Sequence, residues 1–117
     1  MSENKDIDAE IAVRLFGWRA EPHPLGSWYY KPDSPRFPFS FCPSTDPADS
    51  RKVIDELKRR KFDLEILATC DKGSFVGVFK DGDRVAYGVD EESIDVAVCK
   101  AALAALTNAR EVPHPTN

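Results

Sequence analysis

Apolar residues recur at helical spacing near the start of the chain. Ile7, Ile11 and Leu15 lie four residues apart, which places them on one side of a helix of about three turns. Gly17 follows directly and is typical of a residue that ends a helix. The pattern predicts an amphipathic helix that ends at this glycine.

Two later segments also predict helices. Asp46 before Pro47 is typical of an N-cap followed by a proline in the first turn, and it predicts a helix to about residue 60. The acidic stretch at 90–93 opens the third segment, which continues to about residue 107 with alanines on its apolar side. Alanines permit close packing, either inside a monomer or across a homodimer, and we expect self-association.

Between these two helices, residues 62–88 alternate with a period of two. Apolar residues at 62, 64, 66 and 68 alternate mostly with polar ones, and SFVGVF at 74–79 and RVAYG at 84–88 continue the strand pattern. Turn sequences lie between them, at residues 71–73 and at Asp81-Gly82. The pattern predicts a three-stranded antiparallel meander. Both faces of SFVGVF are apolar, so we expect it to be a middle strand covered on two sides.

Residues 18–43 have a different character. They contain six of the nine prolines and seven of the twelve aromatic residues, and this aromatic content argues against a disordered linker. We interpret them as an ordered, irregular loop that wraps the domain, with SWYY at 27–30 as a short strand at a sheet edge. Phe37, Phe39 and Phe41 alternate, so they are expected to pack on one side against helices or a sheet edge.

These elements predict an α+β fold of one domain. The expected architecture is a three-layer α/β/α sandwich, in which a small antiparallel sheet carries helices on both faces. We expect the domain to cover residues 1–109 and residues 110–117 to form a flexible tail.

Composition places the chain among ordinary globular domains. Of 117 residues, 42% are hydrophobic and 31% charged, and the formal net charge is −4, which argues against non-specific nucleic-acid binding. Three widely spaced cysteines and the absence of an apolar signal or membrane segment predict a reduced, cytoplasmic protein that does not bind membranes.

The residues that usually carry catalysis or bind metals are sparse. The two histidines are His23, between prolines, and His114, in the terminal tail; neither location predicts a positioned imidazole. No CxxC, HxxxH or HExxH motif and no glycine-rich phosphate loop is present. We therefore expect no catalytic residues, no metal and no cofactor. A small metal-dependent hydrolase using Asp46 with Asp49 or Asp63 is the least favoured hypothesis.

Binding chemistry has more candidates. The basic run at 58–61 would supply charge through Arg59 and Arg60, and aromatic residues would supply stacking surfaces for a nucleotide base. The complete candidate ligand-binding set is Trp18, Trp28, Tyr30, Thr45, Asp46, Arg59 and Arg60. Each has a structural alternative: core packing for the aromatic residues, a helix cap for the pair at 45–46, and a solvated helix end for the arginines.

Three stretches in this order resemble the phage ABA sandwich domain family: DAEIAVRLFGW at 8–18, STDPADSRKVIDEL at 44–57 after Trp28 and a proline-rich stretch, and DVAVCKAALAAL at 95–106. The resemblance covers most of residues 5–107 and implies an α/β/α sandwich made by a phage or prophage inside a bacterium. It supplies no catalytic residues. One departure is Cys42-Pro43, which separates Phe41 from the Ser-Thr-Asp that we expect to follow it directly.

Two functional hypotheses follow. The first is a non-enzymatic phage accessory protein that binds a host component, in its most concrete form a counter-defence protein that sequesters a nucleotide immune signal. The alternative is an adaptor or inhibitor of a host protein that uses the proline- and aromatic-rich segment or a sheet edge as its contact surface.

Overall fold

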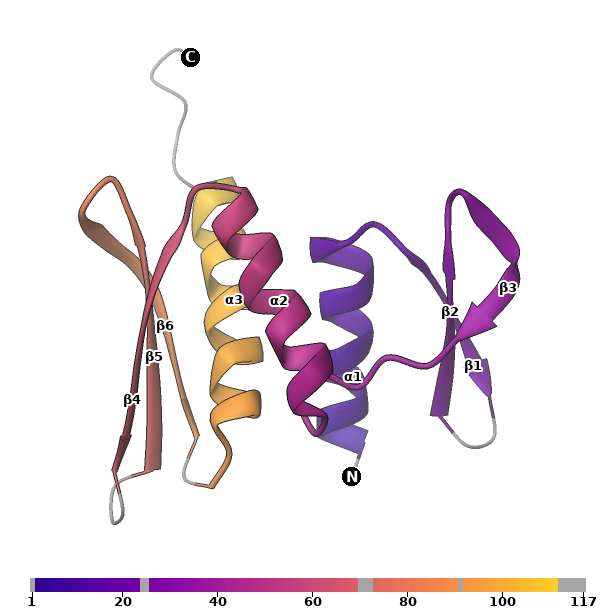
Figure 1. Cartoon of the computed structure of the whole chain (residues 1–117), viewed down its shortest axis with the longest axis horizontal. Helices are drawn as coiled ribbons and strands as arrows, with labels where there is room; N and C mark the ends of the chain where they lie inside the picture. Colours follow the sequence, from indigo (N-terminus) through magenta and orange to yellow (C-terminus); the bar gives the residue numbers. More distant parts are fainter. Residues whose placement is uncertain (1, 24–25, 70–72, 91, 112–117) are drawn as a thin grey trace.

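The computed structural model describes residues 2–23, 26–69, 73–90 and 92–111 (Figure 1). The elements are α1 (Ser2–Glu10), η1 (Ile11–Leu15), β1 (Arg19–His23), β2 (Gly26–Lys31), β3 (Ser34–Phe39), α2 (Pro47–Arg59), β4 (Asp63–Thr69), β5 (Gly73–Lys80), β6 (Asp83–Asp90) and α3 (Ile94–Glu111). The segment η1 is a π-helical continuation of α1.

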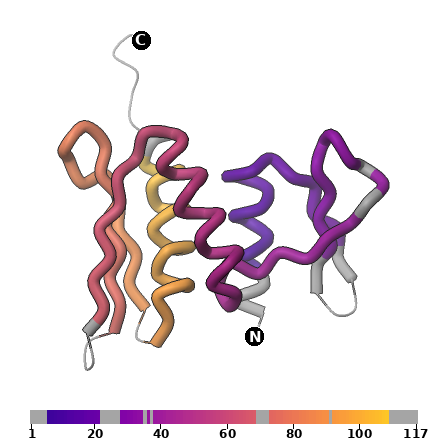
Figure 2. The backbone as a smooth tube through the Cα atoms, viewed as in Figure 1, coloured from indigo at the N-terminus to yellow at the C-terminus, as the bar shows by residue number. Residues whose placement is uncertain are grey.

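Helices form the middle of the molecule and a sheet lies on each side of them. The backbone trace shows sheet β4–β6 beside α3 and α2, and sheet β1–β3 beyond α1 (Figure 2). Both sheets are antiparallel meanders, with strand orders β1-β2-β3 and β4-β5-β6. The predicted α+β sandwich is confirmed, and a second small sheet is added to it.

The predicted meander is sheet β4–β6, with β5 in the middle. Its inner face carries Val76, Val78 and Ala86, which are buried against the helices. The turn between β5 and β6 contains Asp81 and Gly82 with φ of 55° and 86°, as an Asp-Gly hairpin requires. The other face of β5 is not covered by a described helix, in contrast to the expectation that both faces would be covered (Figure 1).

The interpretation of residues 18–43 as an irregular loop is wrong, because most of them form sheet β1–β3. SWYY belongs to β2, the middle strand rather than an edge. Pro22 lies in β1, and Pro35 and Pro38 lie in β3. These are the two edge strands, where one side of the backbone needs no partner and proline is tolerated. A register shift between Tyr29 and Lys31 further accommodates β3.

The predicted helix end at Gly17 and the predicted helix start at Asp46 are confirmed. Gly17 has φ of 73°, and the N–H groups of Gly17 and Trp18 bond to the carbonyls of Val13 and Ala12, so a left-handed glycine closes the first helix. Asp46 is the N-cap of α2. The last helix continues to Glu111, four residues beyond the predicted end.

The alanines of α3 pack inside the monomer. Ala97, Ala101, Ala102 and Ala105 are fully buried in the core, so they do not present a surface for a homodimer. Within the described residues, no helix is long and apolar enough to cross a bilayer. Parts of several sequence predictions fall outside the described residues: residues 71–72 of the turn predicted at 71–73, residues 112–117 of the tail predicted at 110–117, with His114, and the Phe37 side chain.

Candidate functional site

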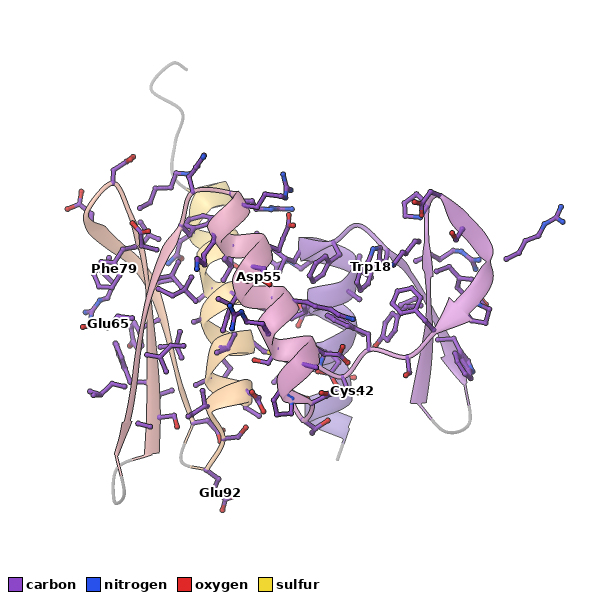
Figure 3. The ribbon with its side chains drawn as sticks, viewed as in Figure 1. Trp18, Cys42, Asp55, Glu65, Phe79 and Glu92 are labelled. Carbon is purple, nitrogen blue, oxygen red and sulfur yellow. The ribbon has the colours of Figure 1, made fainter. Side chains whose placement is uncertain are left out.

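Trp18 belongs to an aromatic cluster between the helices and sheet β1–β3 (Figure 3). Its ring stacks on Phe16 at a centroid distance of 4.4 Å and meets Phe39 and Phe41 edge-on at 4.9 Å. Phe41 is fully buried, and the Lys31 ammonium lies 5.8 Å from the centre of the Trp18 ring. This position favours the core-packing interpretation of Trp18, because its ring faces are used by neighbouring side chains.

Trp28 and Tyr30 lie on the opposite face of the same sheet. Tyr29 between them is buried and packs against Phe39 and Phe41, so strand alternation directs its two neighbours away from the helices. Both side chains are half-buried. Trp18 and Trp28 therefore do not converge on one ligand.

Arg19 and Glu21, two residues that the sequence did not single out, share this outer face of β1–β3. Arg19 pairs with Tyr30 and Glu21 with Trp28 in the strand register. The Arg19 guanidinium lies 4.0 Å from the centre of the Tyr30 ring, and it forms an ion pair with Glu21. The result is a surface of two aromatic rings and a charged pair. We call Arg19, Glu21, Trp28 and Tyr30 the aromatic face.

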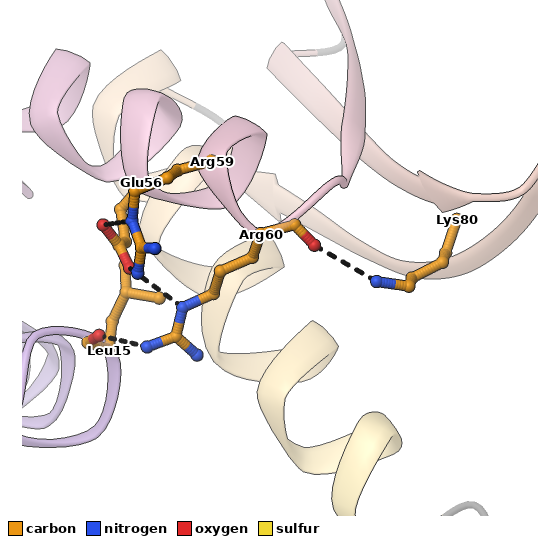
Figure 4. Close-up of polar contacts among 5 residues, drawn as sticks. All are labelled: Leu15, Glu56, Arg59, Arg60 and Lys80. Atoms are coloured by element: carbon orange, nitrogen blue, oxygen red, sulfur yellow. Dashed lines mark hydrogen bonds and ion pairs between the residues drawn. The ribbon is translucent and has the colours of Figure 1, made fainter.

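Arg59 and Arg60 form a different group, at the end of α2 (Figure 4). Both guanidinium groups donate to Glu56: Arg59 Nε at 2.9 Å and Arg60 Nε at 3.0 Å. Arg60 Nη2 also donates to the backbone carbonyl of Leu15 at 2.6 Å, and so joins α2 to the end of η1. The hydrogen bonds from Arg59, with those from Arg60, hold the pKa of Glu56 below its usual value. Arg60 thus serves the fold, and Arg59 is an exposed ion-pair partner.

Thr45 and Asp46 lie in the turn that begins α2. The Asp46 carboxylate accepts a hydrogen bond from the Ala48 amide at 2.9 Å, which is the geometry of a helix cap. Two further carboxylates bond to amides in the preceding segment: Asp8 to Ser44 at 2.9 Å, and Asp49 to Cys42 at 2.9 Å. A phosphate at this helix start would meet three carboxylates, so the helix-cap interpretation is favoured over anion binding.

Burial shifts the pKa values of titratable groups near this turn. Burial raises the pKa of Asp8 above its usual value, although the Ser44 amide opposes the shift. Burial also raises the pKa of the Cys42 thiol, and the carboxylates of Asp8 and Asp49 add to this. A raised pKa leaves less thiolate, which is the nucleophilic form. Cys99 is buried and its pKa is raised too. Among the described residues no cluster of acidic, histidine or cysteine side chains could hold a metal ion.

Two surface hollows among the described residues lie elsewhere. One of about 550 Å³ is lined by residues of β6 and α3, including Arg84, Tyr87 and Asn108. Another of about 360 Å³ lies near Asp90 and Lys100. Neither is lined by a residue of the predicted binding set. The structure therefore distributes that set over a core cluster, the aromatic face, a helix cap and a helix end.

Comparison with known proteins gives one match. No curated protein matches the sequence. No solved structure matches it either. The model of the phage ABA sandwich domain matches residues 9–103, which include all the elements from η1 to β6 and the first half of α3. The chain therefore belongs to the phage ABA sandwich domain family.

Proposed function

We propose that the protein is a phage or prophage accessory protein that acts in the bacterial host cytoplasm by binding a host protein, without catalysing a reaction. The observation that carries this proposal is the aromatic face of sheet β1–β3 (Arg19, Glu21, Trp28 and Tyr30). Trp, Tyr and Arg are the residue types most enriched at the energetic centres of protein interfaces. Here one of each lies on the side of the sheet turned away from the core.

The edges of this sheet favour docking on its face over the addition of a strand. Strand addition requires a row of free backbone N–H groups, which proline lacks. The two edge strands contain Pro22 in β1, and Pro35 and Pro38 in β3. A partner would therefore contact side chains on the face, and the specificity would come from the rings and from the Arg19–Glu21 pair.

The same geometry does not favour sequestration of a nucleotide, the other form of a counter-defence role. That hypothesis needs a stacking ring and an available cation in one pocket. Arg60 is instead bonded to Glu56 and Leu15, and Trp18 is enclosed by other rings. Inhibition or capture of a host defence protein through the aromatic face requires none of these residues.

The proposal is tested by capture followed by a measured affinity. The tagged protein is expressed in the bacterial host, co-purifying proteins are identified, and each is purified and titrated by calorimetry. The test variant is Trp28→Ala/Tyr30→Ala, and the matched control is Arg59→Ala, which alters the exposed basic helix end. Circular dichroism and thermal melting establish that each variant is folded.

We expect the test variant to weaken binding at least 30-fold, since each hot-spot truncation costs about 2 kcal/mol or more. The control is expected to bind like the parent protein. A partner that binds the test variant with unchanged affinity would contradict the proposal, as would the absence of any partner above background. We expect the same calorimetry to give no binding heat with cyclic and ADP-ribose-type nucleotides. Binding heat that the parent protein gives and the test variant lacks would show that the ligand of the aromatic face is a nucleotide and not a protein.

A further inference from the structure

The outer face of sheet β4–β6 is a second exposed surface, on the far side of the molecule from the aromatic face. Phe79 and Glu65 project from this sheet away from the helices (Figure 3). Strand alternation and register place five large apolar side chains on this side: Leu67, Phe75, Phe79, Tyr87 and Val89. Leu67, Tyr87 and Val89 are 57%, 55% and 44% exposed. An apolar group of this extent on a sheet face is typical of an interaction surface. We call it the open face.

The rings on the open face are held by neighbouring groups. Phe75 and Phe79 flank Gly77, and a Cβ at this glycine would lie 3.3 and 3.1 Å from their ring atoms. The Phe75 ring also stacks with Tyr87 at a centroid distance of 5.7 Å. Because neighbouring side chains hold these rings, little side-chain entropy is lost when a second surface covers them.

Charged residues lie at both margins of the open face and have opposite signs. Asp63 and Glu65 lie on β4, at one margin. Arg84 lies on β6, at the other, and its guanidinium extends over the Phe75 and Tyr87 rings at 5.8 and 5.4 Å. Within the described part of the chain, none of these three charges forms an ion pair. The open face is thus acidic on one side and basic on the other.

We propose that the occupant of the open face is a second copy of this chain, related by a twofold axis that runs along β5. Such an axis places β4 of one copy over β6 of the other and leaves the position of each residue along the strand direction unchanged. Residues that are paired across neighbouring strands lie at the same position along this direction, which we call a level. Asp63, Phe79 and Arg84 share one level, so Asp63 of each copy opposes Arg84 of the other. The acidic margin of each copy then faces the basic margin of the other.

The other two levels are also complementary. Glu65 and Tyr87 share the level of Gly77, so the Tyr87 hydroxyl of one copy faces the Glu65 carboxylate of the other. Arg84 leans toward the same level, which brings it within reach of both acidic positions. Leu67 and Val89 share the level of Phe75 and meet as an apolar pair. A twofold axis perpendicular to the strands would instead place β4 over β4 and β6 over β6, and so oppose margins of like charge.

The twist between packed sheets preserves these pairings. Aligned sheets pack at about 30° and about 10 Å apart, and edge strands lie about 4.8 Å from the central strand. The rotation therefore displaces opposed edge residues by only about 2.4 Å, less than the ~6.8 Å between successive levels on one face. The face is small, roughly 14 by 24 Å from strand spacing and rise, so we expect a dimer with a micromolar dissociation constant.

The test uses two variants with reversed margins. Arg84→Glu makes both margins acidic, and Asp63→Arg/Glu65→Arg makes both basic. Sedimentation velocity from 1 to 500 µM measures self-association of the parent protein, each variant alone, and an equimolar mixture of the variants. Val13→Glu is the matched control, because Val13 is 48% exposed on η1, outside the open face. All substituted side chains are exposed, and thermal melting verifies that the variants fold.

We expect the parent protein and the control to dimerise alike, and each variant alone to dimerise at least tenfold more weakly. The mixture is expected to form a heterodimer with a dissociation constant within about threefold of the parent value, because it restores both sets of opposite charges. A parent protein that stays monomeric at 500 µM would overturn the proposal, and so would variants that self-associate as tightly as the parent. Failure of the mixture to associate would exclude the twofold arrangement. None of these outcomes depends on the aromatic face or on a host partner.

Discussion

Substitution of Gly88 by alanine examines the close contact between β6 and α3. A Cβ at this position would lie 2.3 Å from the Ala97 carbonyl oxygen and 2.4 Å from the Ala101 nitrogen. Both atoms belong to the backbone of α3, so no side-chain rotation relieves the clash and the helix itself must move. Overpacking typically costs about 1–3 kcal/mol, and a rigid backbone obstacle places this substitution at the upper end. We expect Gly88→Ala to lower the free energy of unfolding by about 3 kcal/mol.

Gly77→Ala is the matched control, since Gly77 lies in the neighbouring strand on the other face. Its Cβ would meet only the movable edges of two phenyl rings, at 3.1 and 3.3 Å. We expect a change of at most about 1 kcal/mol, partly offset by the lower entropy of the unfolded alanine chain. Urea denaturation followed by circular dichroism measures both values. Equal stability of the two variants would refute the close packing of α3 on β6.

Four further substitutions examine individual polar contacts. Arg60→Ala is expected to destabilise the protein by about 1–2 kcal/mol in chemical denaturation, because it removes a charge-assisted hydrogen bond to a backbone carbonyl. Arg59→Ala is the control and should change the stability little, because its ion pair is exposed. Equal effects of the two substitutions would contradict the structural role of Arg60. Asp46→Ala is expected to cost about 1 kcal/mol through loss of the helix cap, as measured by the same titration. Asp8 has a raised pKa, so its ionisation opposes folding, and the free energy of unfolding should fall as the pH rises from 3.8 through the higher pKa of the folded state. Asp8→Asn should flatten that part of the pH profile in melts from pH 4 to 7, and an unaltered profile would show that Asp8 is not responsible.

The elements with strong local signals could be predicted from the sequence. Three of these signals depend only on residues close together in the sequence: the strand period at 62–88, the Asp-Gly turn and the Asp46-Pro47 helix start. The structure contains all three features. Sheet β1–β3 is not apparent from the sequence, because the density of prolines in this segment argues against strands. Proline is incompatible only with a central strand, whose backbone N–H groups all donate hydrogen bonds to neighbouring strands. Here the prolines lie in the two edge strands, β1 and β3.

The candidate site was harder to predict because it depends on which face each side chain occupies. Once β2 is recognised as a strand, alternation alone separates Trp28 and Tyr30 from the buried Tyr29, so this signal was available in SWYY. No local signal shows that Arg60 bonds to the Leu15 carbonyl, 45 residues earlier in the chain. Such tertiary contacts decide whether an arginine is available to a ligand.

The central claim is that the aromatic face of β1 and β2 is the recognition surface for a host partner. Hydrogen–deuterium exchange of the protein, alone and saturated with its purified partner, tests this most directly. We expect the partner to slow exchange in peptides covering β1 and β2 and to leave the end of α2 at 56–61 unchanged. Slower exchange at the end of α2, with none in β1 and β2, would contradict the claim and return recognition to the basic residues.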